Sequence, residues 1–323
     1  MNNYLNYKTY NSYDCYNSCI YNYCQNQNLH FTRGDIYFYG EPIIITLNAP
    51  EADDFSTNLH SGQILFHRDV FPESRMLEFK NDLEAKQYLI DSLTTNPTFL
   101  ILQVSTTSLT YDKTFLEYRR MLHFVSILGI DDSHSKLYIS DGNTPNFQTY
   151  QGYVDFDCIF DGWKSEKFKT FTLIPNDNID IQSIKEQSKH NFLLTLESYL
   201  NPSSDESFYR GKDTMREYFK NLLRLSKETS LVPKINDIIF QIKWKGFLTL
   251  KYFILDYIKE NSYSPEIIKG YDEIINGWEL FCFKLIRAIV SNNHSKIEGC
   301  FAFGENLLTN EEQIISQILN SSK

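Results

Sequence analysis

Three residues that together could perform nucleophilic catalysis lie far apart in the chain. Cys15 opens a segment with helical character, His123 opens an apolar strand-like segment, and Asp141 closes the next one. A thiol becomes an effective nucleophile when a base takes its proton, and the base needs a third group to fix its tautomer and orientation. The sequence therefore predicts a nucleophile at Cys15, a base at His123 and an orienting carboxylate at Asp141.

The polar turn between His123 and Asp141 allows their register to be predicted. Residues 130–136 separate two alternating apolar segments, a pattern typical of a hairpin. If the turn centres near residue 132, the numbers of paired residues sum to about 264, as those of His123 and Asp141 do. Directly opposed side chains have Cβ atoms about 4.5–5.5 Å apart. We therefore expect a direct imidazole–carboxylate pair.

The start of the predicted helix favours Cys15 over the neighbouring cysteines as the nucleophile. Asp14 is a good N-cap residue, and residues 15–25 contain no proline or glycine. A thiol in the first helical turn lies near the positive end of the helix dipole, which lowers its pKa from about 8.5, whereas the charge of Asp14 raises it. A His123 imidazolium beside the thiol is expected to outweigh the charge of Asp14 and to lower the pKa of Cys15. Cys19 and Cys24 are expected to pack inward as small apolar residues.

Composition narrows the class of protein. The chain has 323 residues, of which 42% are hydrophobic, so a globular protein is expected. The formal net charge of −10 argues against nucleic acid as a partner, because phosphate binding needs a basic surface. Residues 1–7 lack the apolar stretch of a signal peptide, and the most apolar segment, residues 246–258, is too short to span a bilayer. Six cysteines without zinc-ligand spacing then indicate free thiols in the cytoplasm, with no metal and no membrane association.

The order of helical and strand-like patterns predicts an α+β fold followed by a helical domain. Up to about residue 173, helical patterns come first and the strand-like patterns of an antiparallel sheet follow. Beyond the turn after residue 173, the pattern is almost wholly helical. The turn-forming segment 174–178 separates them, so we expect a catalytic domain at residues 1–175 and a helical domain at residues 176–323. Besides the hairpin, the expected strands are 35–39, 42–46, 98–104, 153–160 and 168–173, and the expected helices are 15–25, 81–93, 181–200, 212–227, 235–260, 265–291 and a short one from about 309.

Several blocks of the sequence resemble the butirosin biosynthesis protein H family, in which a papain-like domain precedes a helical one. The matching blocks are residues 14–16, 34–40, 123–132 and 138–141, with a looser match at 209–212. The resemblance implies a papain-like fold for the first domain. It also implies transfer of an acyl or aminoacyl group from a carrier-protein thioester to a small-molecule amine, forming an amide in antibiotic-type natural-product biosynthesis. The implied partner is an acyl or peptidyl carrier protein whose phosphopantetheine arm carries the substrate, and no cofactor is bound by the chain itself.

The oxyanion donor and the second half-reaction remain open. Papain-like enzymes often place an amide side chain shortly before the cysteine to donate into the oxyanion hole. Residues 9–12 contain no glutamine, and Asn11 could take this role or be a plain turn residue. Two other functions compete: a papain-like or C39-like cysteine peptidase or thioester hydrolase, and a non-catalytic binding protein. The acyl group, the amine and the oligomeric state are not encoded in these motifs.

Overall fold

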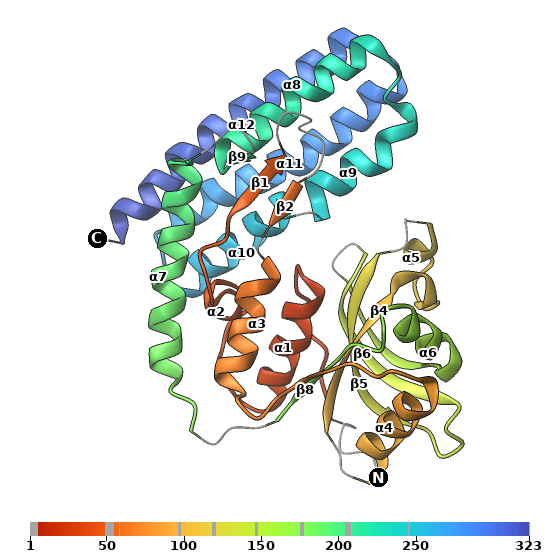
Figure 1. Ribbon diagram of the computed structural model, residues 1–323. Coiled ribbons are helices and arrows are strands. Elements are labelled where there is room, and N and C mark those ends of the chain that lie inside the picture. Colours follow the sequence, from red (N-terminus) through yellow and green to blue (C-terminus); the bar gives the residue numbers. More distant parts are fainter. Residues whose placement is uncertain are drawn as a thin grey trace. The chain divides into compact units, whose positions relative to one another are not determined.

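The computed structural model describes residues 6–48, 55–57, 59–95, 98–117, 121–145, 148–174, 178–203, 208–244 and 246–322. Its helices and antiparallel sheets give the α+β class that the sequence predicts. The chain forms two compact units, shown in Figure 1. We call Met1–Ile36 with Gln63–Lys185 the Cys15 unit, and Tyr37–Gly62 with Glu186–Lys323 the helical unit.

This division differs from the two consecutive domains expected from the sequence. The expected boundary residues 175 and 176 lie outside the described residues, and the chain passes between units at Lys185 and Glu186. In addition, Tyr37–Gly62 belongs to the helical unit. The reason is a backbone ladder: β1 (Ile45–Asn48) pairs antiparallel with β2 (Phe55–Thr57) and with the distant β9 (Phe208–Arg210). A change in composition along the chain cannot reveal such a pairing.

A six-stranded antiparallel sheet organises the Cys15 unit, in the order β3-β8-β4-β5-β6-β7. The strands are β3 (Met76–Leu77), β4 (Phe99–Ser105), β5 (Leu122–Ile130), β6 (Lys136–Thr144), β7 (Gln148–Asp155) and β8 (Thr170–Leu173). Every residue of β4 is buried, which explains its continuous apolar sequence. The strands expected at 98–104 and 168–173 are thus confirmed within one or two residues.

Helices cover both faces of this sheet. One face packs on α4 (Asp82–Thr94) and α6 (Phe156–Ser165), with a core that includes Leu89, Leu102, Val125, Ile139 and Trp163. The other face packs on α1 (Cys15–Asn26), which lies across the sheet from α4 and α6 in Figure 1. The helix expected at 81–93 is α4, and the side chain of Asn81 caps it by accepting a hydrogen bond from the Glu84 N–H.

Two predicted strands are wrong because local capping overrides the β-propensity of aromatic residues. Residues 35–39 belong largely to helix α2 (Arg33–Phe38). Thr32 and Asp35 form a reciprocal capping box, with Thr32 N–H donating to Asp35 Oδ2 at 2.9 Å and Asp35 N–H to Thr32 Oγ1 at 3.0 Å. The strand expected at 153–160 ends at Asp155, whose side chain caps α6 by accepting from two backbone N–H groups. Of the segment 42–46, only the last two residues belong to β1.

The helical unit contains α7 (Ile181–Leu200) from Glu186 onward, together with α8 (Lys212–Glu228), α9 (Ile235–Trp244), α10 (Phe247–Glu260), α11 (Pro265–Val290) and α12 (His294–Ser321). The helices expected at 181–200, 212–227 and 265–291 are confirmed, and the Ser264 side chain caps α11 by accepting a hydrogen bond from the Ile267 N–H. The single helix expected at 235–260 is broken at Gly246, whose φ of 116° a side chain would strain. The last helix begins at His294 rather than near 309, because Asn293 caps it. In the described part of the chain, no helix is both long and apolar enough to cross a membrane.

A buried ion pair connects four helices of this unit. Lys251 Nζ of α10 lies 2.5 Å from Glu311 Oε1 of α12, and both side chains are 1% exposed. Tyr199 of α7 and Tyr271 of α11 also donate to the Glu311 carboxylate, at 3.1 and 3.2 Å. Burial lowers the pKa of Lys251, and the charge and hydrogen bond of Glu311 oppose that shift. Because a buried charge is costly unless paired, this cluster favours one arrangement of the four helices.

Candidate active site

Cys15 is the first residue of α1, and side chains of the preceding segment define that helix start. Asp14 Oδ1 accepts a hydrogen bond from the Asn17 N–H at 2.8 Å, as the N-cap prediction requires. Ser12 Oγ donates to Asn17 Oδ1, also at 2.8 Å. Cys15 is partly exposed, whereas Cys19 and Cys24 are buried, which confirms that these two cysteines pack inward.

Gly142 lets α1 approach β6 closely. A Cβ atom at this position would lie 2.2 Å from Ser18 Oγ and 2.3 Å from the carbonyl oxygen of Tyr10. The Gly142 carbonyl in turn accepts a hydrogen bond from the Ser12 N–H at 2.8 Å. Gly142 therefore sets the separation between the helix that carries the thiol and the strand that carries Asp141. The sequence signal for this role was a glycine directly after the candidate carboxylate, and our prediction did not use it.

His123 and Asp141 are paired, although not in the predicted register. His123 Nε2 donates to Asp141 Oδ2 at 2.8 Å. The hairpin pairs Ser126 with Ser140, which displaces the register by two residues from the expected one, and it is irregular between Ile127 and Gly129. Direct opposition is therefore wrong. A displacement of two residues keeps both side chains on the same face of the sheet, so diagonal neighbours can still meet.

The Asp141 carboxylate is buried and accepts two further hydrogen bonds. The Asn143 N–H donates to Oδ1 at 2.9 Å, and the Tyr111 hydroxyl donates to Oδ2 at 2.6 Å. The Tyr111 ring stacks on Tyr150, with centroids 4.1 Å apart. These contacts fix the carboxylate and leave its Oδ2 shared between Tyr111 and His123. Our sequence analysis missed Tyr111, which precedes Asp141 by 30 residues.

The surroundings of His123 keep its imidazole protonated. Burial by itself lowers the pKa of this group, but the charges of Asp141 and Cys15 and hydrogen bonds to both outweigh burial and raise the pKa to about 10. Because Nε2 faces Asp141, the nitrogen that serves Cys15 is Nδ1. The ring also lies against Phe115, with centroids 5.0 Å apart.

The pKa of the Cys15 thiol is raised, contrary to the lowering expected from the helix dipole. Burial is the largest cause; the charge and hydrogen bond of His123 and a backbone hydrogen bond from Phe124 oppose it, while the charge of Asp14 adds to it. The charged forms of the two groups favour each other, because the thiolate raises the pKa of His123 and the imidazolium lowers that of Cys15. A thiolate–imidazolium pair of this kind is the reactive form of a catalytic thiol.

The predicted oxyanion donor Asn11 lies on an exposed segment before α1. Its backbone carbonyl and its side-chain oxygen both accept from Arg33 Nη1, at 3.1 and 3.3 Å. This contact orients the Asn11 side chain. Its role toward an oxyanion stays a prediction.

A buried tyrosine–histidine pair anchors α1 beside the site. The Tyr16 hydroxyl lies 2.6 Å from His67 Nδ1 in α3 (Leu59–Val70), and His67 Nε2 lies 2.8 Å from the Thr172 carbonyl of β8. Because a carbonyl only accepts, Nε2 carries the proton and Nδ1 accepts from Tyr16. Burial lowers the pKa of His67, with the Thr172 hydrogen bond opposing, so the pair stays neutral and holds the residue next to Cys15 in place.

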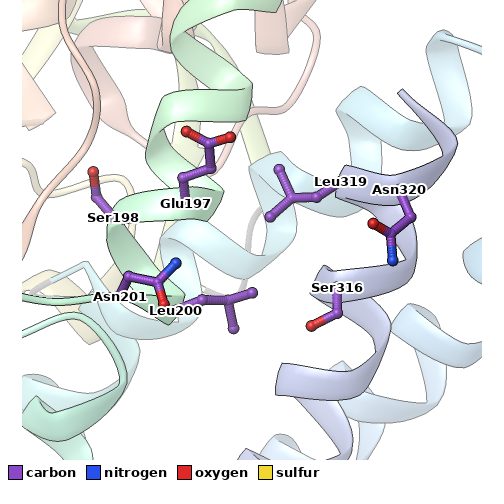
Figure 2. Close-up of a pocket in the computed structure, with 7 residues that line it drawn as sticks. All are labelled: Glu197, Ser198, Leu200, Asn201, Ser316, Leu319 and Asn320. Atoms are coloured by element: carbon purple, nitrogen blue, oxygen red, sulfur yellow. The ribbon is translucent and has the colours of Figure 1, made fainter. Parts of the chain in front are cut away.

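The helical unit offers a groove between α7 and α12, and it contains none of the three candidate residues. Figure 2 shows the lining residues Glu197, Ser198, Leu200, Asn201, Ser316, Leu319 and Asn320. Among the residues that the structure describes, no group of three or more His, Cys, Asp or Glu side chains could hold a metal ion.

Two comparisons of the sequence with known proteins found no match. The chain matches no protein-family profile, and a search of curated proteins found no similar sequence. The geometry of Cys15, His123 and Asp141 is therefore the basis for proposing a function.

Proposed function

We propose that this protein is a cysteine-dependent acyltransferase in which Cys15 attacks an acyl thioester and passes the acyl group to an amine. The observation that carries the proposal is the position of His123 between Cys15 and the buried Asp141: its Nε2 donates to Asp141 Oδ2 at 2.8 Å, and the His123 and Cys15 side chains each shift the pKa of the other. Each member comes from a different element, α1, β5 and β6, and each has its own anchoring contacts. A helix that presents the thiol against an antiparallel sheet that presents the base also supports a papain-like architecture for the Cys15 unit.

The chemistry balances with these three side chains alone. In the thiolate–imidazolium form of the site, the Cys15 thiolate attacks the thioester carbonyl, and the bond to the carrier sulfur breaks. The His123 imidazolium gives its proton to the departing thiolate and becomes the base. An amine then attacks the Cys15 thioester, the neutral imidazole accepts its proton, and Cys15 leaves as a thiolate. Asp141 accepts the hydrogen bond from Nε2–H throughout, so that Nδ1 stays turned toward the sulfur.

The resemblance of residues 14–16 and 123–132 to the butirosin biosynthesis protein H family supports the choice of substrates. On that basis the acyl donor is the phosphopantetheine thioester of an acyl or peptidyl carrier protein, and the acceptor is a small-molecule amine of antibiotic-type biosynthesis. Cysteines that are all free in this structure agree with a reducing cytoplasm.

The proposal is tested by following the acyl group. Incubation with an acyl-loaded carrier protein should add the acyl mass to Cys15, and a suitable amine should then release it as an amide. Cys15→Ala should abolish the adduct, whereas Cys158→Ser, which removes the other partly exposed thiol, should leave it unchanged. Adduct formation followed by free acid at a rate independent of amine would assign a hydrolase instead. The absence of an adduct from a panel of acyl-loaded carriers and acyl-pantetheine thioesters would refute the thiol mechanism.

A further inference from the structure

One face of α11 carries three exposed apolar side chains. Leu280, Phe283 and Val290 are 47%, 60% and 63% exposed. Because an α-helix turns by about 100° per residue, the three positions fall within an arc of about 80° around the helix. Single exposed apolar residues are common on protein surfaces, whereas several on one helix face, bordered by charged residues, are typical of an interaction site.

Three cations lie beside these apolar side chains. Lys284 and Arg287 are exposed on α11, and the helical turn places both within about 40° of Leu280. Lys243 of α9 reaches the same face, because its Nζ lies 5.7 Å from the centroid of the Phe283 ring. We call the six residues together the α11 patch: Lys243, Leu280, Phe283, Lys284, Arg287 and Val290.

The cations of the α11 patch are not balanced by carboxylates. In the part of the chain that the structure describes, no ion pair includes Lys243, Lys284 or Arg287. Residues 280–297 contain no Asp or Glu, and Glu279 at their border accepts a hydrogen bond from a tyrosine hydroxyl of α10. The α11 patch is therefore positive on a chain with a formal net charge of −10.

We propose that the α11 patch binds an acidic amphipathic helix of a partner protein, in which leucine-like side chains lie between carboxylates. The apolar side chains of that helix would cover Phe283 and its neighbours, and its carboxylates would pair with the three cations. The inference does not depend on the proposed acyl transfer. It adds a surface on the helical unit that recognises another protein.

Other occupants fit the α11 patch less well. A second copy of this chain would bring like charges together across a twofold axis, which is unfavourable. An anionic membrane would face a wide area of this acidic chain and repel it, whereas a single helix covers the patch alone. From Leu280 to Val290 the patch spans about 15 Å, so about ten residues of a partner helix cover its length.

A synthetic helix of this chemistry tests the proposal on the full chain. The probe is a fluorescent peptide of about 18 residues, long enough to form a helix, with leucines along one face and glutamates beside them. Its fluorescence anisotropy should rise on titration with the protein, and the affinity should fall as salt is added, because part of the contact is ionic. A peptide with lysine in place of each glutamate should bind roughly tenfold more weakly.

Matched variants locate the bound peptide. Lys284→Glu should weaken binding of the acidic peptide roughly tenfold. Lys269→Glu is its control, because it reverses one exposed charge of α11 about 22 Å along the axis, beyond the screening length of about 8 Å, and should leave the affinity unchanged. Phe283→Ser should weaken binding to a similar degree, whereas Leu83→Ser, which removes a 79% exposed side chain of α4, should not. Thermal unfolding should be unchanged in all four variants, because each side chain is exposed.

Three results would each overturn the proposal: equal affinity for the two peptides, unchanged affinity in Lys284→Glu and Phe283→Ser, or no saturable binding below about 1 mM. Sedimentation of the protein as a dimer that Phe283→Ser dissociates would assign the patch to a second copy instead. Binding to vesicles of phosphatidylserine and phosphatidylcholine that Lys284→Glu abolishes would assign it to a membrane. None of these measurements involves Cys15, so their failure leaves the acylation test of the proposed function unaffected.

Discussion

Replacement of Asp141 by asparagine tests the site most sharply, because the amide can keep two of the three contacts of the carboxylate. Its oxygen can still accept from the Asn143 N–H, and its NH₂ can donate to the Tyr111 oxygen. The contacts to Tyr111 and His123 both reverse in direction. The Tyr111 hydroxyl can accept as well as donate, but an NH₂ facing Nε2 requires Nε2 to accept and so to lose its proton. The imidazole proton then moves to Nδ1, which faces Cys15 and can no longer take the thiol proton.

The size of the effect follows from the charge that is lost. The pKa of His123 is about 10, against an ordinary value of about 6.5, and one unit corresponds to about 1.4 kcal/mol. Among the causes that raise this pKa, the charge of Asp141 is the largest, so its removal should lower the pKa by about 1–3 units. The lowered pKa and the wrong imidazole tautomer act together. We therefore expect acylation of Cys15 to slow by about 10²–10⁴-fold, which corresponds to roughly 3–5 kcal/mol in activation free energy.

The assay is single-turnover acylation of Cys15, followed by mass spectrometry, alongside thermal unfolding to exclude loss of the fold. Asp131→Asn is the matched control: it removes an exposed carboxylate in the turn of the same hairpin, where Asp131 accepts from Ser133 and Ser135. This control should acylate normally. Retention of acylation within about threefold in Asp141→Asn would refute the assignment of Asp141 as the orienting group.

Three further predictions concern the packing and the protons of the site. Gly142→Ala should separate α1 from β6, lower the free energy of unfolding by about 1–3 kcal/mol in urea denaturation and slow acylation of Cys15. Gly299→Ala is the control, because an added Cβ there meets nothing within 4 Å. It should change neither the free energy of unfolding nor the acylation rate. Asp14→Asn preserves an N-cap but removes a charge that raises the pKa of Cys15, so alkylation of Cys15 by iodoacetamide at pH 7 should accelerate. His123→Ala removes the charge and hydrogen bond that lower this pKa, so alkylation should slow. Slower alkylation in Asp14→Asn and faster alkylation in His123→Ala would disprove this account of the thiol. Because the pKa of His123 is raised from 6.5 to about 10 in the folded protein, the stabilisation from its charged contacts is complete below about pH 6.5 and is lost as the pH rises toward about 10. The free energy of unfolding should therefore fall over this interval, and less so in His123→Ala.

The sequence was sufficient to predict that His123 and Asp141 pair with each other and lie on one face of the sheet. Side-chain direction in a strand has a period of two, so His123 and Asp141 share a face in the predicted register and equally in the observed one. The displacement arises in the turn, because Ile130 pairs with Leu137 and the turn therefore centres beyond residue 132, whereas the irregularity between Ile127 and Gly129 moves the pairing back by one residue. The alternation of apolar residues predicts neither. Tyr111 was missed for a related reason, since its contact with Asp141 exists only after the sheet has formed.

Electrostatics and domain limits were harder to predict. The helix start of Cys15 was predicted correctly, but its pKa is governed by burial, which a sequence does not report. In contrast, the helix α2 could have been predicted, because the pattern of Thr32 and Asp35 is a capping signature that deserved more weight than the aromatic residues after it.

The pairing of β1 with β9 has a consequence for how the chain folds during synthesis. The Cys15 unit is complete once residue 185 has been made, whereas β1 and β2 must wait for β9 at residues 208–210 before their sheet can form. In that interval β1 presents unpaired backbone groups, which favour aggregation. A fragment that ends near residue 175 would keep β1 permanently without this partner. A soluble minimal Cys15 unit should therefore be made by replacing residues 37–62 with a short linker and ending the chain after residue 185.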